Sequence, residues 1–222
     1  MYLTIHLFFF RMTIKYNKKP IYWEKAKKYL IKNDPVLKKI IKSVNTNHFL
    51  LRNSTSFQTL ANAIIGQQIS VAAASSVLRK LKSKIKVISA KNIYSASKNV
   101  LANSGLSRQK ITYLKILSEK FVKEPNYFYG FKNLEDEVII SRLCKLKGIG
   151  EWTAQMYLIF QLNRPDVLPL ADIGFISSVR RIYKLNEPKL SDIISISKKW
   201  GNYKTVAVWY IWRIIDPEVV QY

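Results

Sequence analysis

The chain of 222 residues contains one cysteine, Cys144, and two histidines. A single cysteine excludes an intrachain disulfide, a cysteine-ligated iron–sulfur cluster and a zinc finger. Two histidines are too few for a histidine-rich metal site. We therefore predict no metal centre, and we expect Cys144 to be an ordinary buried thiol in a reducing compartment.

Acidic residues are also scarce. The chain has 14 Asp+Glu against 37 Lys+Arg, which gives a formal net charge of +23. Such a basic balance favours a polyanionic partner, either nucleic acid or an anionic membrane surface. Hydrophobic residues make up 48% of the chain. That content is enough for a packed core and excludes a disordered basic tail.

Long hydrophobic runs are absent. Residues 1–10 are apolar but far shorter than the ~20 residues that span a bilayer, and they lack the features of a signal peptide. Met12 follows closely and is an alternative start, so we treat residues 1–20 as an N-terminal extension and 21–222 as one domain. We expect an intracellular protein that has no membrane partner and associates with nucleic acid.

Glycine and proline number only seven each and lie mostly between segments with helical periodicity. In one such segment Leu114, Leu117 and Phe121 share a face, as expected for a helix. Residues 84–88 and the first dozen residues alternate as strands do. The pattern predicts an all-α fold with helices over 23–32, 35–44, 57–68, 71–81, two within 90–103, and 107–121, 133–146, 151–162, 172–183, 191–200 and 205–215.

The segment 143–162 reads as two helices joined by a glycine turn. Gly148 and Gly150 flank one apolar residue, Ile149. Glycine lets the backbone approach a ligand closely, and Ile149 would plug down between the helices. The N–H groups at the start of the second helix would then suit a DNA phosphate. A simple tight turn is the alternative.

Asp172 follows this segment at a spacing that allows the chain to return to the glycine turn. The helix 151–162 spans ~18 Å, and the nine-residue connection 163–171 can extend to ~30 Å. The chain can therefore return so that Asp172 opens the next helix near the glycine turn. A carboxylate beside a DNA backbone opposes binding unless it has a chemical role. Asp172 could equally be a helix N-cap, or serve as both.

Three ordered motifs together resemble the helix-hairpin-helix DNA glycosylases, specifically the alkylation-repair branch typified by 3-methyladenine DNA glycosylase II. They are LANAIIGQQISVAAASSVL at 60–78, LKGIGEWTAQMY at 146–157 and VLPLADIGF at 167–175, with a weaker match at 105–110. The resemblance implies two helical subdomains around a central cleft. Residues 1–35 are too few for the extra β-domain of longer relatives, so the chain is similar to the short form.

The resemblance also implies residue roles. Asp172 corresponds to the catalytic carboxylate. Bifunctional members have a Schiff-base lysine two residues after the second glycine, where this chain has Trp152, so no AP-lyase activity is expected. Lys147 replaces the usual proline of the turn. The expected DNA-backbone contacts are Gly148, Ile149, Gly150, Lys147 and Thr153, and the expected helix-junction residues are Gln67, Gln68 and Ser70. No cofactor is expected, although the hairpin backbone could hold a monovalent cation.

Chemistry adds the remaining expectations. A base inside a duplex must be flipped out, and a wedge must fill the gap. The resemblance implies that Arg108 aligns best with the family's wedge position and Leu106 second, although Leu106 could be core and Arg108 a phosphate contact. An alkylated purine is cationic, so aromatic walls would favour it. We expect Trp152 and Met156 to be such walls, and the resemblance adds Trp212, which best matches a pocket tryptophan of the family. Trp209 and Tyr210 are expected in the core.

The predicted function is therefore a monofunctional glycosylase that hydrolyses the N-glycosidic bond of 3-methyladenine or 7-methylguanine in double-stranded DNA, acting as a monomer. Three rivals remain: a non-enzymatic DNA-binding module, a glycosylase for oxidised or mismatched bases, and a basic RNA-binding protein. The last explains the charge but not the hairpin and the aspartate.

Overall fold

The computed structural model describes residues 19–44, 49–50, 54–186 and 189–215, and these residues form helices joined by turns and loops, with no strand among them. The all-α prediction is confirmed. In chain order the helices are α1 (Trp23–Asn33), α2 (Pro35–Ser43), α3 (Ser56–Gly66), α4 (Val71–Ile85), α5 (Ala90–Ser95), α6 (Lys98–Ala102), α7 (Arg108–Lys123), α8 (Asp136–Cys144), α9 (Glu151–Met156), α10 (Ile173–Ile182), α11 (Leu190–Ser197) and α12 (Lys204–Ile215).

Shorter turns complete the chain. There are 3₁₀ turns at Pro125–Phe128, Phe131–Asn133 and Lys198–Trp200, and a π-helical turn at Tyr157–Gln161. No helix in the part of the chain that the structure describes is long and apolar enough to cross a membrane.

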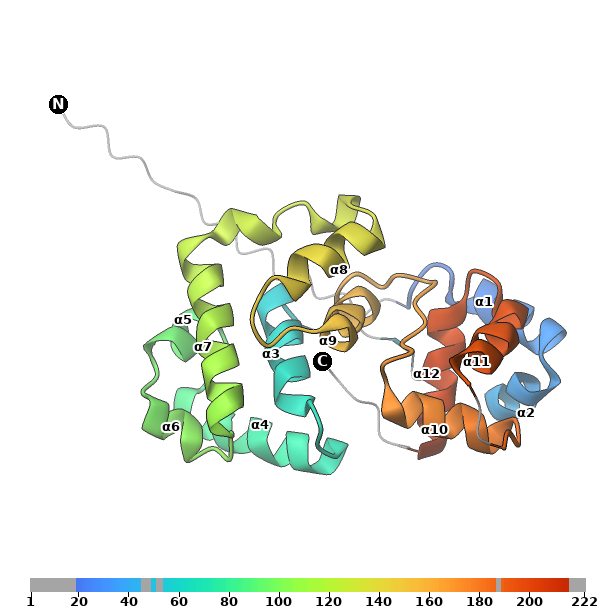
Figure 1. The fold of residues 1–222 in the computed structure, drawn as a ribbon, viewed down its shortest axis with the longest axis horizontal. Coiled ribbons are helices and arrows are strands. Elements are labelled where there is room, and N and C mark those ends of the chain that lie inside the picture. The colour runs from blue at the N-terminus through green and yellow to red at the C-terminus, as the bar shows by residue number, and fades with distance from the viewer. Residues whose placement is uncertain (1–18, 45–48, 51–53, 187–188, 216–222) are drawn as a thin grey trace.

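The helices form two groups (Figure 1). In the first group α7 packs on α3 and α5, and α3 also contacts α4 and α9. In the second group the N-terminal helices α1 and α2 pack against α12, which in turn contacts α10. The connection from the π-helical turn to α10 passes from the first group to the second. The Asp172 segment therefore lies where the two groups meet.

Local sequence explains several helix starts. Asp34 caps α2 by accepting the backbone N–H groups of Val36 (2.9 Å) and Leu37 (3.1 Å), with Pro35 at the first helical position. Thr55 and Gln58 form a capping box at α3. Serines cap α4, α5, α6 and α7. These helix starts can be predicted from the sequence, because each has a polar residue at the N-cap position.

Large apolar side chains fill both groups. In the second group Trp23 of α1 meets Trp209 of α12 edge-on, with 5.2 Å between ring centroids. Trp209 and Tyr210 are buried, as predicted. In the first group Phe121 stacks on Phe128 at 3.7 Å. Each group thus has its own aromatic contacts within a continuous core.

Three expectations from the sequence are wrong. Lys84 and Ile85 end α4 instead of starting a strand, because the helix cap of α4 falls at Lys86. The helix predicted over 151–162 changes after Met156 into the π-helical turn, where Leu162 N–H donates to Tyr157 O (3.2 Å). Cys144 is exposed, because it lies on the outer face at the end of α8. The strand expected in the first dozen residues, like most of the extension 1–20, falls outside the described residues.

Candidate active site

The hairpin between α8 and α9 packs its central residue inward and one glycine against a neighbouring helix. Ile149 is 4% exposed, and its N–H donates to Leu146 O (3.0 Å). Gly148 has φ +94°, and a Cβ there would lie 2.1 Å from Cγ of Tyr113 on α7. Only glycine fits this position. A Cβ on Gly150 would meet nothing within 4 Å, so that glycine faces open space.

The junction between α3 and α4 is held against the hairpin by one amide. Nε2 of Gln67 donates to Gly148 O and to Oγ1 of Thr153, both at 3.0 Å. Gln68 follows with φ +57°, an uncommon conformation for a residue other than glycine. Gln67 and Gly148 lie 81 residues apart in sequence. The GQQ motif and the glycine turn therefore form one structural unit through a tertiary contact.

The connection 163–171 is anchored by polar contacts along its length. Arg164 pairs with Asp136 at 2.8 Å, and its guanidinium also donates to the Leu134 carbonyl (2.6 Å). Burial raises the pKa of Asp136, and the positive charge of Arg164 offsets part of that rise. The buried Thr205 hydroxyl donates to Arg164 O (2.6 Å) and accepts from Val167 N–H (3.0 Å). These contacts fix the path of the chain to Asp172.

Asp172 opens α10 as predicted, and its carboxylate has two partners. Oδ1 accepts the backbone N–H of Phe175 (2.6 Å), which makes Asp172 the N-cap. Oδ2 accepts the indole N–H of Trp152 from α9 (2.8 Å). The side chain is only partly buried, so each carboxylate oxygen keeps lone-pair capacity toward the open side. Asp172 is therefore both a helix N-cap and a carboxylate that is accessible for chemistry.

The carboxylate faces a cavity of about 620 Å³ between the two helix groups. Its walls include the indoles of Trp152 and Trp212 and the thioether of Met156. Trp212 is stacked on Phe160, with 5.9 Å between centroids and 11° between the rings. The cavity is of a size that holds a small organic ligand, and its walls are largely apolar with one carboxylate.

The rim of this cavity is formed by the junction and the hairpin. Gln67, Gln68 and Ser70 lie there, together with Gly150 and Thr153. A second cavity of about 610 Å³ lies beside it, lined by Gln67, Gln68, Ile69, Ser107, Gln109, Lys110, Tyr113, Gly148, Ile149 and Gly150. The glycine turn therefore borders both cavities.

The residues considered for DNA contact differ in exposure. Lys147 and Arg108 are exposed, at the hairpin and at the start of α7. Thr153 is 1% exposed, and its hydroxyl is engaged by Gln67. Leu106 is 6% exposed and belongs to the core, which favours the alternative reading of that residue. Arg108 itself lines neither cavity, whereas Gln68 lines both.

Phe160 and Arg213 are among the cavity residues that were not predicted from the sequence. Phe160 lies one helical turn beyond Met156, and the spacing Trp152, Met156, Phe160 could have indicated it. Arg213 follows Trp212 directly, and its guanidinium carbon lies 5.2 Å from the Trp209 ring centroid. Nothing in the sequence pattern indicated that the charged Arg213 would lie in this largely apolar wall.

Comparison with known proteins identifies relatives along most of the chain. Residues 61–202 match the HhH-GPD superfamily, described as base excision DNA repair proteins. The DNA-3-methyladenine glycosylase of Saccharomyces cerevisiae is 29% identical over 213 residues, which cover 88% of this chain and 72% of that protein. The Bacillus subtilis protein YfjP is 40% identical over 85 residues, but these span only 38% of this chain and 30% of YfjP.

A solved structure agrees with the fold. The 3-methyladenine DNA glycosylase Mag1 of Schizosaccharomyces pombe, determined in complex with abasic DNA, superimposes with a TM-score of 0.75. It is 28% identical in sequence and covers 85% of this chain and 95% of Mag1. The likeness includes both helix groups and not the hairpin alone.

Proposed function

This chain belongs to the HhH-GPD superfamily of base excision DNA repair proteins, and we propose that it is a monofunctional DNA glycosylase for alkylated purines. The observation that carries the proposal is the carboxylate of Asp172, partly exposed in an aromatic cavity beside the glycine hairpin. The names of its relatives, DNA-3-methyladenine glycosylases from two yeasts, support this substrate class.

Binding begins, in this proposal, at the hairpin. The glycine turn and Lys147 meet a phosphate, and the duplex opens toward the cavity. Flipping a base costs a few kcal/mol, which a plug in the emptied stack helps to offset. Arg108 is our candidate for this wedge. The turn at Gln68 and Ile69 is a second candidate, because it borders both cavities and Ile69 is 39% exposed.

Selection follows from the charge of the lesion. A purine alkylated at N3 or N7 is cationic, and the indoles of Trp152 and Trp212 attract it by up to ~2 kcal/mol when desolvated. Normal bases, being neutral, gain less from these walls. Arg213 on the same wall opposes a cation, so we expect its engagement with Trp209 to turn its charge away from the base.

Base release needs little acid catalysis, because the cationic base is already a good leaving group. As the N-glycosidic bond breaks, positive charge develops on the sugar, and the Asp172 carboxylate stabilises it. The same carboxylate orients the attacking water. Trp152 occupies the position of the lysine in bifunctional relatives and cannot form a Schiff base, so the strand stays intact.

The direct test is incubation of the protein with a methylated duplex, followed by mass analysis of released bases and by gel analysis of the strand. We expect free 3-methyladenine or 7-methylguanine and an intact abasic strand. Binding without any released base would favour a DNA-binding module. Release of oxidised bases alone, or a borohydride-trapped protein–DNA adduct, would favour another glycosylase type.

A further inference from the structure

Carboxylates are absent from a long part of the first helix group. Residues 54–118, which contain α3, α4, α5, α6 and the start of α7, include ten Lys and Arg and no Asp or Glu. The 14 acidic residues of the chain all lie before or after this stretch. The charge of +23 is therefore distributed unevenly over the molecule.

Eight of these cations are exposed and define what we call the acid-free face: Arg79, Lys80, Lys82, Lys84, Lys86, Lys91, Lys98 and Arg108. None of them forms an ion pair with a carboxylate of the described residues. Cations elsewhere do, such as Lys120 with Glu124, Arg164 with Asp136 and Lys204 with Asp166. The acid-free face thus presents a positive field with no local counter-charge.

Helix α4 carries four of these eight cations, and little of its surface is buried. Of the 15 residues of α4 only Leu81 is fully buried, whereas the 11-residue α3 buries seven. The exposed side also carries Ala72, Ala73 and Ser75, which are too small to block close approach. A helix that contributes so little to the core, yet keeps its cations and small residues, is suited to an external polyanion.

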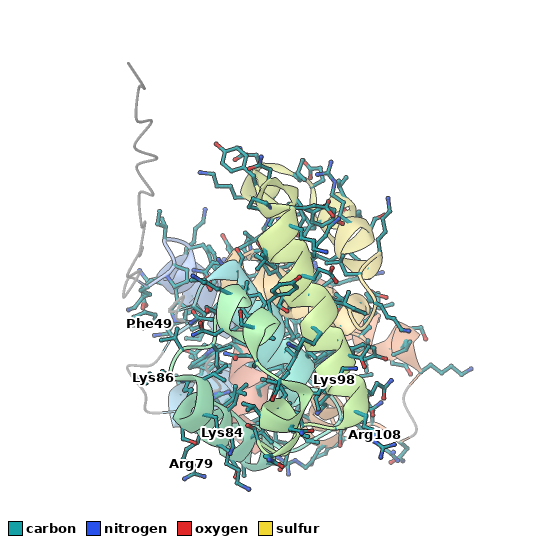
Figure 2. All side chains as sticks on the ribbon, turned by 90° about the vertical axis from the view of Figure 1, so that its left-hand side faces the viewer. Phe49, Arg79, Lys84, Lys86, Lys98 and Arg108 are labelled. Carbon is teal, nitrogen blue, oxygen red and sulfur yellow. The ribbon has the colours of Figure 1, made fainter. Side chains whose placement is uncertain are left out.

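The acid-free face extends from the hairpin side of the molecule around its end. In Figure 2 Arg108 lies toward one lower edge of the view and Lys86 toward the other, with Lys98 and Lys84 between them. At the Arg108 end, the neighbouring Ser107 and Gln109 line the second cavity together with the glycine turn. The charge is therefore continuous with the proposed lesion-binding surface.

We propose that the acid-free face binds the backbone of the same duplex beyond the part held by the hairpin. This inference rests on the proposed function, because it places a lesion-bearing duplex at the hairpin. Phosphates run along that duplex in both directions, and a face continuous with the hairpin meets one flank. The interaction adds affinity without reading sequence and plays no part in bond cleavage.

The test compares duplexes of two lengths carrying one central alkylated base, about 12 and about 40 base pairs. We replace four cations of the acid-free face by glutamine, as Arg79→Gln, Lys84→Gln, Lys86→Gln and Lys98→Gln. Wild type should bind the long duplex more tightly and with a steeper salt dependence. The variant should not show this difference, because its slope falls by about 0.9 for each phosphate that the face no longer neutralises. Four such phosphates amount to a roughly 100-fold smaller response to a fourfold rise in salt.

A matched control removes the same charge from the other helix group. Lys28→Gln, Lys38→Gln, Lys39→Gln and Lys42→Gln lie on exposed sides of α1 and α2, and this control should keep the length dependence. Both variants should retain the thermal unfolding midpoint and the excision rate on the short duplex. If the control loses as much affinity as the test variant, or if the test variant keeps the length dependence, the inference is wrong. Absence of excision by wild type would instead overturn the proposed function.

Discussion

Two aspartates of this chain have nearly the same local structure and different surroundings. Asp34 and Asp172 each cap a helix through its third backbone N–H, and each accepts an indole N–H, from Trp200 at 3.0 Å and from Trp152 at 2.8 Å. Asp34 is 0% exposed and also accepts the Tyr183 hydroxyl at 2.5 Å. Asp172 is partly exposed and lines the cavity.

The difference indicates how one residue type can stabilise the fold at one position and, in our proposal, serve chemistry at another. The carboxylate of Asp34 receives four hydrogen bonds, which use its acceptor capacity, and it has no access to solvent. Asp172 receives two and keeps an open side. We therefore assign stability to Asp34 and reactivity to Asp172. The two should respond in opposite ways to matched substitutions.

The largest expected loss of stability is that of Asp34→Ala. It leaves the Tyr183 hydroxyl, the Trp200 indole and two backbone N–H groups of α2, at buried or partly buried positions, without their acceptor. We expect the free energy of unfolding to fall by about 3–5 kcal/mol. Denaturant unfolding measures it. Excision per folded molecule should be unchanged. A specific loss of excision would contradict the assignment of a purely structural role to Asp34.

The next effect is that of Trp200→Phe. Trp200 is fully buried, so the change removes the indole donor to Asp34 and leaves a small cavity. We expect a loss of about 2–3 kcal/mol in unfolding free energy. A stability equal to that of wild type would show that the indole hydrogen bond to Asp34 is dispensable.

Tyr183→Phe should cost about 1 kcal/mol near neutral pH, because it removes one hydrogen bond to Asp34. Burial, reinforced by Asp34, raises the pKa of Tyr183 far above 10. In the unfolded chain this tyrosine loses its proton near pH 10, while the folded chain keeps it. The contribution of Tyr183 to the free energy of unfolding is thus fully present below about pH 10. Above that pH it declines by about 1.4 kcal/mol per pH unit.

The variant lacks that decline, so the stability gap between wild type and Tyr183→Phe should shrink above about pH 10. Unfolding curves recorded from about pH 7 to about pH 11 measure the gap. Because burial also raises the pKa of Tyr210, to about 12, both proteins share its alkaline loss and the comparison remains matched. A gap that stays constant over this range would contradict the buried hydrogen bond.

A smaller change in stability is expected for Trp152→Phe, the counterpart of Trp200→Phe. Trp152 is only partly buried, so unfolding free energy should fall by less than about 1 kcal/mol. Without the indole donor, Asp172 is less firmly held, and single-turnover excision should slow by about tenfold. If Trp152→Phe destabilises as much as Trp200→Phe, the two aspartates do not differ as we describe.

Features set by a few neighbouring residues could be predicted from the sequence. The capping aspartates, the buried Ile149 between two glycines and most helix positions follow from local patterns. The helix pattern also predicts an all-α fold. The sequence explains glycine at 148 by its backbone freedom. The structure adds a second reason, because the Tyr113 ring leaves no room for a Cβ at this position.

Features that depend on packing between distant segments could not be predicted. The Trp152–Asp172 hydrogen bond depends on how α9 and α10 meet across the cavity. The π-helical turn shifts Phe160 relative to a regular helix, and it coincides with a hydrogen bond from Thr59 of α3 to Gln161 (2.9 Å). Alternation at 84–88 suggests a strand, but α4, which is capped by Ser70, continues as far as Ile85.

The central claim is that Asp172, unlike Asp34, carries the chemistry, and single-turnover base release by Asp172→Asn tests it most directly. Asparagine keeps the size and one oxygen acceptor but removes the charge that would stabilise the developing cation. We predict a rate at least about 100-fold below wild type on a methylated duplex, with DNA affinity and unfolding free energy nearly unchanged. Base release within a few-fold of wild type would contradict the assignment.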